Sequence, residues 1–299
     1  MKKILITGAN SYIGNSIKRY FASYQAGHKA ERWLTDTVSL RDGAWEQADF
    51  SGYDTILHMA GIAHADIGRV SEETKETYYR VNCDLAVRTA KKAQMEGVKQ
   101  FVYMSSVIVY GDSAPVGKQK NITENTEPAP ANFYGDSKYQ AELKLRELQT
   151  EAFRVAIVRA PMIYGKGSRG NFPMLLKLAK KTPVFPKIQN QRSMLYVENL
   201  AEFLRLLTEA GIGGTFFPQN KEYVTTAEMV SLMGEALGRR VRLWRLINPP
   251  VKLAAKMPGR LGGMARKAFG SLTIDRELSN REITGYQIFS LEESIRRSI

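Results

Sequence analysis

Two residues suited to proton transfer, Tyr134 and Lys138, stand four positions apart in a stretch with helical periodicity. On a helix, residues at this spacing share a face, with about 5–6 Å between their Cβ atoms. A nearby lysine ammonium stabilises a phenolate, so it should lower the tyrosine pKa from its usual value of about 10. The pair therefore predicts a phenolate base that takes a proton from an alcohol.

A serine pair, Ser105 and Ser106, closes the segment 100–105, which is rich in Phe, Val and Tyr like a buried strand. In open α/β sheets, ligands bind beyond the carboxyl ends of the strands. A hydroxyl group at this point can form a hydrogen bond to the oxygen that Tyr134 deprotonates. Capping of the next segment is the alternative role for both serines.

A turn containing two glycines follows the first expected strand and reads Thr7-Gly8-Ala9-Asn10-Ser11-Tyr12-Ile13-Gly14. Gly8 permits a tight turn, and Gly14 permits close packing of the next helix on the strand. Backbone N–H groups and a positive helix end at such a turn attract phosphate. The turn predicts a dinucleotide site, with an ordinary strand-to-helix turn as the alternative.

The end of the second expected strand, residues 37–40, is where a dinucleotide enzyme contacts the ribose. An acidic residue there favours NAD, whereas an arginine accommodates the 2′-phosphate of NADP. Ser39 and Arg41 favour NADP, while Asp42 or Asp36 could supply a carboxylate for NAD. The predicted cofactor is therefore NADP or NAD, with NADP slightly favoured.

Alternating strands and helices must place these groups at one edge of a sheet. The alternation predicts an α/β fold with a doubly wound, Rossmann-type parallel sheet and a smaller, mostly helical C-terminal substrate lobe. Expected strands lie at 2–7, 37–40, 53–58, 100–105, 154–159 and 214–218, and expected helices at 13–24, 73–95, 132–151, 172–181 and 198–209, with mostly helix after 226. The expected dinucleotide-binding domain is 1–165, with 192–220 returning to it, and the expected substrate lobe is 166–191 and 221–299.

Composition limits the class of protein. The chain has 299 residues, 43% of them hydrophobic, so a sizeable core can form. Its apolar runs are far shorter than a membrane span, and its single cysteine, Cys83, suits a reducing cytoplasm. The net charge of +13 fits a diphosphate-bearing substrate, an anionic membrane, nucleic acid, or simply a solubilising surface. We predict a cytoplasmic protein with no metal site.

Taken together, these motifs resemble those of the extended short-chain dehydrogenases/reductases that act on nucleotide sugars as epimerases, dehydratases or reductases. The resemblance covers most of the chain and is strongest over residues 1–220. Besides the turn and the Tyr134/Lys138 pair, it rests on His58-Met59-Ala60-Gly61, Val81-Asn82, Ser105-Ser106-Val107-Ile108-Val109-Tyr110-Gly111, and the segment from Arg159 to Gly167.

The resemblance assigns roles to single residues. The family's catalytic serine, tyrosine and lysine fall on Ser106, Tyr134 and Lys138. The predicted cofactor contacts are Gly8, Asn10, Ser11, Tyr12, Ile13, Gly14, Ser39, Arg41, Asp49, Phe50, Ala60, Gly61, Asn82, Lys138 and Pro161, with Asp49 and Phe50 at the adenine. Because Ser11 stands where the family has a glycine, the backbone there must keep a conformation open to L-residues.

On the substrate side, similarity to UDP-sugar epimerases implies contacts from Ser106, Asn171, Phe185 and Arg192. The planar guanidinium of an arginine matches the oxygens of a diphosphate. A structural ion pair is the alternative role for Arg192, and ordinary packing is the alternative for Phe185.

Two reactions fit these residues. The family's dehydratases follow their active-site hydroxyl with Asp-Glu, whereas Ser106 is followed by Val107-Ile108, so dehydration is excluded. The predicted activity is a 4-epimerase acting on a UDP-hexose or UDP-N-acetylhexosamine by transient C4 oxidation. The alternative is an NADPH-dependent UDP-4-keto-sugar reductase of surface polysaccharide biosynthesis. A non-catalytic regulator with the same fold should have lost Tyr134 or Lys138, and both are present.

Partners beyond the UDP-sugar follow from the resemblance and from one basic segment. The resemblance implies a homodimer formed through helices that include 74–95 and 134–151. We expect no nucleic-acid partner. Residues 250–269 are basic and amphipathic, which predicts weak peripheral contact with an anionic membrane, with a solvated lobe helix as the alternative.

Overall fold

The central layer is a six-stranded parallel sheet in the order β10-β6-β4-β3-β1-β2. The computed structural model describes residues 2–28, 33–63 and 70–299, with the backbone alone at 260 and 261. The strands are β1 (Lys2–Thr7), β2 (Trp33–Val38), β3 (Thr55–His58), β4 (Gln100–Ser106), β6 (Arg154–Ala160) and β10 (Gly214–Phe216). The strand order reverses between β1 and β3, where such sheets bind ligands. The predicted doubly wound, Rossmann-type sheet is confirmed.

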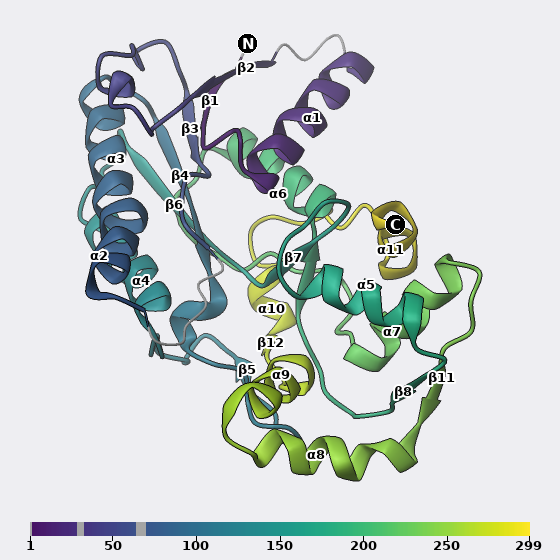
Figure 1. Ribbon diagram of the computed structural model, residues 1–299. Helices are drawn as coiled ribbons and strands as arrows, with labels where there is room; N and C mark the ends of the chain where they lie inside the picture. Colours follow the sequence, from purple (N-terminus) through teal and green to yellow (C-terminus); the bar gives the residue numbers. More distant parts are fainter. Residues whose placement is uncertain (1, 29–32, 64–69) are drawn as a thin grey trace.

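Helices cover both faces of this sheet (Figure 1). Side chains alternate across each strand, so Ile4 and Ile6 of β1 pack on one face while Leu5 packs on the other. The Ile4 face is covered by α1 (Tyr12–Gly27) and α6 (Val197–Ala210), and the Leu5 face by α2 (Glu72–Tyr79), α3 (Leu85–Met95) and α4 (Phe133–Arg146). Burial on both faces explains why these strands are almost continuously apolar.

A second, mostly helical group of elements lies beyond the carboxyl ends of the strands (Figure 1). Its short parallel strand pairs are β7 (Met162–Tyr164) with β9 (Met194–Tyr196), β8 (Val184–Pro186) with β11 (Arg242–Trp244), and β5 (Asn121–Ile122) with β12 (Thr273–Ile274). Its helices are α5 (Asn171–Lys181), α7 (Thr226–Ala236), α8 (Asn248–Lys256), α9 (Gly259–Phe269), α10 (Arg276–Ser279) and α11 (Leu291–Ser298). They enclose a separate core around Tyr164, Phe172 and Val230. No helix in the described part of the chain is long and apolar enough to cross a bilayer.

Three of the differences from the sequence prediction lie near the cleft or in the elements that border it. Strand β2 begins at Trp33 and ends before Ser39, so Ser39 lies in the loop beyond it. The helix predicted over 73–95 is divided by a π-helical turn, Arg80–Asp84, which carries the buried Asn82. Helix α4 ends at Arg146 rather than at 151. Single π-turns often occur at functional sites, and this one lets the Asn82 amide point inward.

Candidate active site

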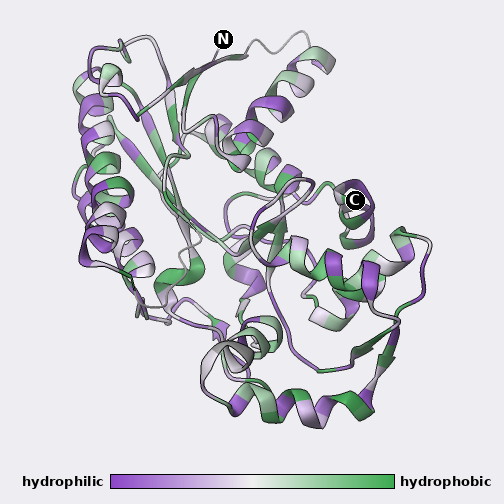
Figure 2. Ribbon diagram, viewed as in Figure 1, coloured by the Kyte–Doolittle hydropathy of each residue, from purple (hydrophilic) through white to green (hydrophobic). Residues whose placement is uncertain are grey.

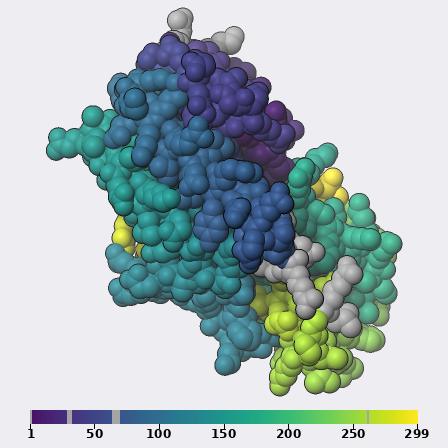
Figure 3. Space-filling model, turned by 60° about the vertical axis from the view of Figure 1, so that its left-hand side comes forward, coloured from purple at the N-terminus to yellow at the C-terminus, as the bar shows by residue number. Residues whose placement is uncertain are grey.

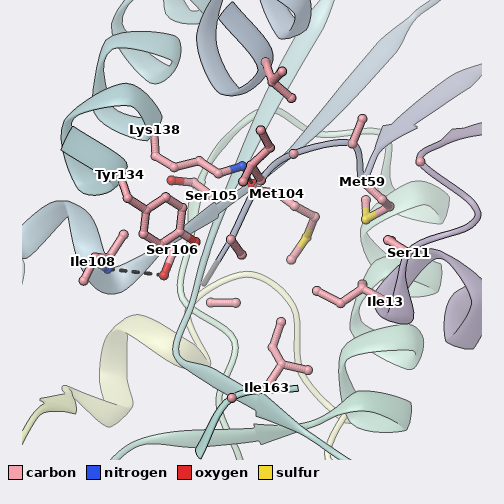
Figure 4. A pocket seen from close by; sticks show the side chains of 18 of the residues that line it. Ser11, Ile13, Met59, Met104, Ser105, Ser106, Ile108, Tyr134, Lys138 and Ile163 are labelled. Carbon is pink, nitrogen blue, oxygen red and sulfur yellow. Dashed lines mark hydrogen bonds between the residues drawn. The ribbon is translucent and has the colours of Figure 1, made fainter. Parts of the chain in front are cut away.

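A cleft of about 1750 Å³ follows the carboxyl ends of β1, β3, β4 and β6 and continues between the sheet and the second group of elements. Figure 4 shows part of its lining. Most of the predicted residues line it: Gly8, Asn10, Ser11, Tyr12, Ile13, Ser39, Arg41, Ala60, Gly61, Ser106, Tyr134, Lys138, Pro161, Asn171 and Arg192. Gly14, Asp49, Phe50, Asn82 and Phe185 are not among the lining residues. One continuous cleft thus joins the predicted cofactor turn to the predicted catalytic side chains.

Tyr134 and Ser106 meet in this cleft (Figure 4). The ring of Tyr134 lies edge-on to Tyr78 of α2, with 6.0 Å between the ring centroids. The Ser106 hydroxyl accepts a hydrogen bond from the backbone N–H of Ile108 at 3.3 Å. Burial and then Tyr78 raise the pKa of Tyr134 to about 12, while a hydrogen bond from Ser106 opposes the rise. The phenol is therefore protonated at neutral pH.

Lys138 lies one helical turn further along α4 and points into the same cleft (Figure 4). Its ammonium donates a hydrogen bond to the carbonyl oxygen of Met104 at 2.8 Å and sits 4.7 Å from the centroid of the Tyr103 ring. Burial lowers the pKa of Lys138 to about 8, and the charge of Glu142 opposes that shift. The predicted lowering of the Tyr134 pKa is not seen in this structure, where burial dominates and raises it.

A buried ion pair fastens α4 to the sheet. The fully buried Glu142 carboxylate accepts hydrogen bonds from the Ser105 hydroxyl at 2.5 Å and from the Arg159 guanidinium at 2.5–3.1 Å. Arg159 also donates to the Tyr110 hydroxyl at 2.5 Å. This network joins α4, β4 and β6 directly behind Ser106 and Lys138. The sequence analysis missed Glu142, although it stands four residues after Lys138 and therefore on the same helix face.

The turn between β1 and α1 is shaped for close approach of a phosphate group. Gly8 has φ +67°, and a Cβ there would lie 2.6 Å from the Ala60 nitrogen. A Cβ on Gly14 would lie 2.5 Å from the Gly8 carbonyl oxygen. Ser11 has φ −75°, open to any L-residue, and its hydroxyl caps α1 by accepting from the Gly14 N–H at 3.0 Å. Because Gly8 leaves no room for a side chain and the α1 N-terminus points here, the cradle fits a dinucleotide.

The end of the cleft beside β2 contains Arg41 and the Glu46 carboxylate, which forms an ion pair with Arg88. Asp42 accepts from the Ala44 N–H at 3.3 Å, and Asp36 accepts from the Tyr53 hydroxyl at 2.9 Å. Neither aspartate lines the cleft, whereas Ser39 and Arg41 do. Of the four residues considered for the ribose, the two that favour NADP line the cleft and the two that favour NAD do not.

Asp49 and Phe50, the predicted adenine contacts, do not line the cleft. Phe50 is fully buried, with the Lys92 ammonium 5.1 Å from its ring centroid. The Asp49 carboxylate accepts from the Ser51 N–H at 2.8 Å. Trp45 and Arg88 line this end of the cleft instead, and the Arg88 guanidinium lies 5.5 Å from the Trp45 ring centroid. Sequence spacing could not show how the loop after β2 folds.

Asn82 lies behind the cleft wall. Its side-chain oxygen accepts from the Ile62 N–H at 2.8 Å, and its amide donates to the Ile62 carbonyl and to the Ser137 hydroxyl, both at 3.1 Å. It thereby ties the segment after β3 to α4. Asn82, predicted as a cofactor contact, thus holds two neighbouring elements together and does not line the cleft.

The substrate half of the cleft is lined by basic side chains. Arg192 lines it together with Arg169, Arg266 and Lys267, three residues that the sequence analysis did not identify. Arg192 donates to the Lys267 carbonyl oxygen at 2.6 Å, and burial lowers its pKa. Within the described residues, no carboxylate forms an ion pair with any of the four. The ion-pair alternative for Arg192 therefore has no support there.

Two predicted substrate contacts differ in outcome. Asn171 lines the cleft at the first residue of α5. Phe185 is buried in the core of the second group of elements, 5.7 Å from Phe269 between ring centroids, so its packing alternative holds.

Comparison with known proteins gives related sequences and folds. A profile of the NAD dependent epimerase/dehydratase family matches residues 4–216. A UDP-glucose 4-epimerase of Vibrio cholerae is 28% identical over 293 residues, covering 92% of this chain and 87% of that protein. An N-acetyl-alpha-D-glucosaminyl-diphospho-ditrans,octacis-undecaprenol 4-epimerase of Escherichia coli O157:H7 is 29% identical over 214 residues, 68% of this chain and 62% of that one. The fold is shared with dTDP-4-dehydrorhamnose reductase of Bacillus anthracis in complex with NADP (21% identity, TM-score 0.70, 100% and 98% covered).

The Glu142 network leads to a stability prediction. Glu142→Gln keeps the side-chain size but leaves the buried Arg159 charge without its carboxylate. Breaking such a pair costs about 3–5 kcal/mol, so we expect urea denaturation to show this loss in the free energy of unfolding. The exposed Glu147→Gln variant is the matched control and should change by less than about 0.5 kcal/mol. A loss below about 1 kcal/mol for Glu142→Gln would show that the ion pair does not secure α4.

Proposed function

Because the chain belongs to the NAD dependent epimerase/dehydratase family, and is thus an enzyme that uses NAD or NADP, we propose that it is a nucleotide-sugar 4-epimerase. Its substrate would be a UDP-hexose or a UDP-N-acetylhexosamine, oxidised transiently at C4. The observation that carries this proposal is the convergence of Tyr134, Ser106 and Lys138 in one cleft with the Gly8 turn and a basic substrate half.

The catalytic residues would act on the C4 hydroxyl. A bound nicotinamide would accept the hydride that leaves C4 and would later return this hydride to C4. In its ionised form, Tyr134 would take the hydroxyl proton as C4 is oxidised, and the resulting phenol would give the proton back when C4 is reduced. Ser106 donates a hydrogen bond to the phenol oxygen and so favours its ionised form. The positive charge of Lys138, held on the Met104 carbonyl, keeps the floor of the cleft cationic.

The basic substrate half suits a diphosphate. Arg192 is oriented by its hydrogen bond to the Lys267 carbonyl and has no carboxylate partner among the described residues. Guanidinium groups bind phosphate oxygens bidentately. We propose that Arg192, with Arg266 and Lys267 beside it, binds the diphosphate, that Asn171 contacts the sugar, and that 166–191 with 221–299 form the substrate lobe.

Epimerase and reductase differ in the fate of the keto sugar. Similarity to the Vibrio cholerae 4-epimerase over most of both chains supports epimerisation. Ser39 and Arg41 at the ribose end support NADP and hence favour the alternative, an NADPH-dependent UDP-4-keto-sugar reductase. The Escherichia coli relative is named for a lipid diphosphate rather than UDP, but the match covers only 62% of that protein, so we propose UDP as the carrier. A homodimer, a cytoplasmic location and weak membrane contact through 250–269 stay part of the proposal.

Tyr134→Phe tests the proton-transfer role. We expect turnover of the UDP-sugar to fall about 10²–10⁴-fold, because the phenylalanine has no proton to exchange. NADP affinity should stay unchanged. Tyr139→Phe, on the same helix, is the matched control and should retain its turnover. Activity of Tyr134→Phe within a few-fold of the parent would contradict the assignment.

Product analysis separates the two reactions. We expect the purified enzyme to interconvert UDP-glucose or UDP-N-acetylglucosamine with its C4 epimer, with no net consumption of reductant. NMR of the anomeric protons measures this interconversion. If it instead consumes one NADPH per UDP-4-keto-sugar and shows no interconversion, the reductase alternative replaces the epimerase.

Arg41→Ala tests the cofactor preference. The variant should bind NADP about 10–100-fold more weakly, because a charged hydrogen bond to the 2′-phosphate is lost, while its affinity for NAD stays the same. Isothermal titration calorimetry gives the dissociation constants of NADP and NAD, and the ratio of the two is the quantity compared between variants. Arg80→Ala, which removes another arginine lining the cleft, is the control and should leave the ratio unchanged. An unaltered ratio in Arg41→Ala would place the 2′-phosphate elsewhere.

A further inference from the structure

The positive charge of the chain is concentrated in one segment. Residues 237–274 contain nine lysines and arginines and no aspartate or glutamate. The segment contains β11, a 3₁₀ turn (Arg245–Ile247), α8 and α9. Figure 1 and Figure 3 show α8 and α9 at the edge of the molecule farthest from the N-terminus. Helix α8 packs mainly on α9 and on the 3₁₀ turn, so its remaining surface faces outward.

The outward side of α8 is apolar. Leu246, Leu253 and Met257 are 84%, 66% and 51% exposed. Leu253 lies in α8, Leu246 in the 3₁₀ turn before it and Met257 directly after its last residue, and in α8 the Leu253 side chain is opposite the buried Ala255. Of the nine large hydrophobic side chains that are exposed in the described residues, five lie between Trp244 and Met264. Figure 2 shows hydrophobic residues along this segment, and the exposed ones have little cover from the other described residues.

A basic row borders this apolar face. Lys252 and Lys256 are four residues apart in α8 and share a flank of that helix, and Arg245 lies in the 3₁₀ turn that precedes it. All three are exposed. Within the described residues, none of them forms an ion pair. We call Leu246, Leu253, Met257 and this basic row the α8 face.

We propose that the α8 face docks on the surface of an anionic bilayer. Its apolar side chains would enter the boundary between headgroups and acyl chains, and its basic row would contact lipid phosphates. A second copy of the chain fits less well, because a two-fold contact would bring the like charges of two basic rows together without an acidic residue in 237–274. Charge complementarity therefore selects the lipid surface.

The docking surface differs from the segment 250–269 predicted from the sequence. It begins earlier, since Arg245 and Leu246 belong to it. It excludes Phe269, which is buried against Phe185.

Docking of the α8 face would also bring the cleft close to the bilayer. Helix α9 packs against α8 and lines the substrate half of the cleft with Gly263, Arg266 and Lys267. A bilayer on the outer side of α8 would therefore lie one helix away from the proposed diphosphate site. The enzyme would work at the membrane surface, which goes beyond its proposed reaction.

Flotation of the full-length protein, with NADP added, tests this proposal. Vesicles of phosphatidylcholine mixed with phosphatidylglycerol should bind the protein, and pure phosphatidylcholine vesicles should bind it far less. The triple variant Arg245→Gln/Lys252→Gln/Lys256→Gln should lose about a hundredfold in partition coefficient. The triple variant Leu246→Gln/Leu253→Gln/Met257→Gln should lose at least about tenfold.

Matched controls remove the same number of charges or apolar groups elsewhere. They are Lys18→Gln/Lys91→Gln/Lys180→Gln and Leu34→Gln/Met95→Gln/Ile288→Gln, all exposed positions, and both should bind like the parent. None of the α8-face residues lines the cleft, so turnover of soluble UDP-sugar should persist in every variant, which separates this test from that of the reaction. Equal flotation of the α8-face and control variants would overturn the proposal. So would conversion of a dimer to a monomer by the α8-face variants alone, because that face would then bind a second copy.

Discussion

The site depends on one buried charge pair. The Glu142 carboxylate, shielded from water, accepts hydrogen bonds from Arg159 of β6 and from Ser105 of β4. A carboxylate in such surroundings is costly unless its partners compensate it, so the geometry of α4 against both strands is strongly constrained. Tyr134 and Lys138 lie on the same helix, and Ser106 follows Ser105 in the same strand. The positions of all three functional groups are therefore set by one network.

Electrostatic conditions change along the cleft. At the Gly8 turn the groups facing it are backbone N–H groups and a helix end, which bind phosphate without a formal charge. Around Tyr134, burial is the largest influence, and it holds the phenol protonated in this structure. At the far side, Arg192, Arg266 and Lys267 provide positive charge that no carboxylate of the described residues pairs with. This order of environments suits two ligands, a dinucleotide at the Gly8 turn and a diphosphate-linked sugar at the basic side, with the reacting alcohol of the sugar between the two phosphate sites.

Much of this site could be predicted because its residues follow strand ends within short motifs. The Gly8 turn, Ser106 and the Tyr134/Lys138 pair are local patterns, and the parallel sheet brings strand ends together. The path of a loop is set by packing, so Phe50 and Phe185 were assigned to ligands although both are core residues. The pKa of Tyr134 depends on burial, which spacing does not reveal. Arg266 and Lys267 come from a distant segment whose basic character was visible, although its approach to the cleft was not.

A crystal structure with NADP and a UDP-sugar bound would test the central arrangement most directly, through the distances from the sugar C4 oxygen to its neighbours. We expect that oxygen within hydrogen-bonding distance of both the Tyr134 and the Ser106 hydroxyls, with the diphosphate against Arg192. A sugar bound with C4 turned away from Tyr134, or a diphosphate that contacts none of the basic residues of the cleft, would contradict it.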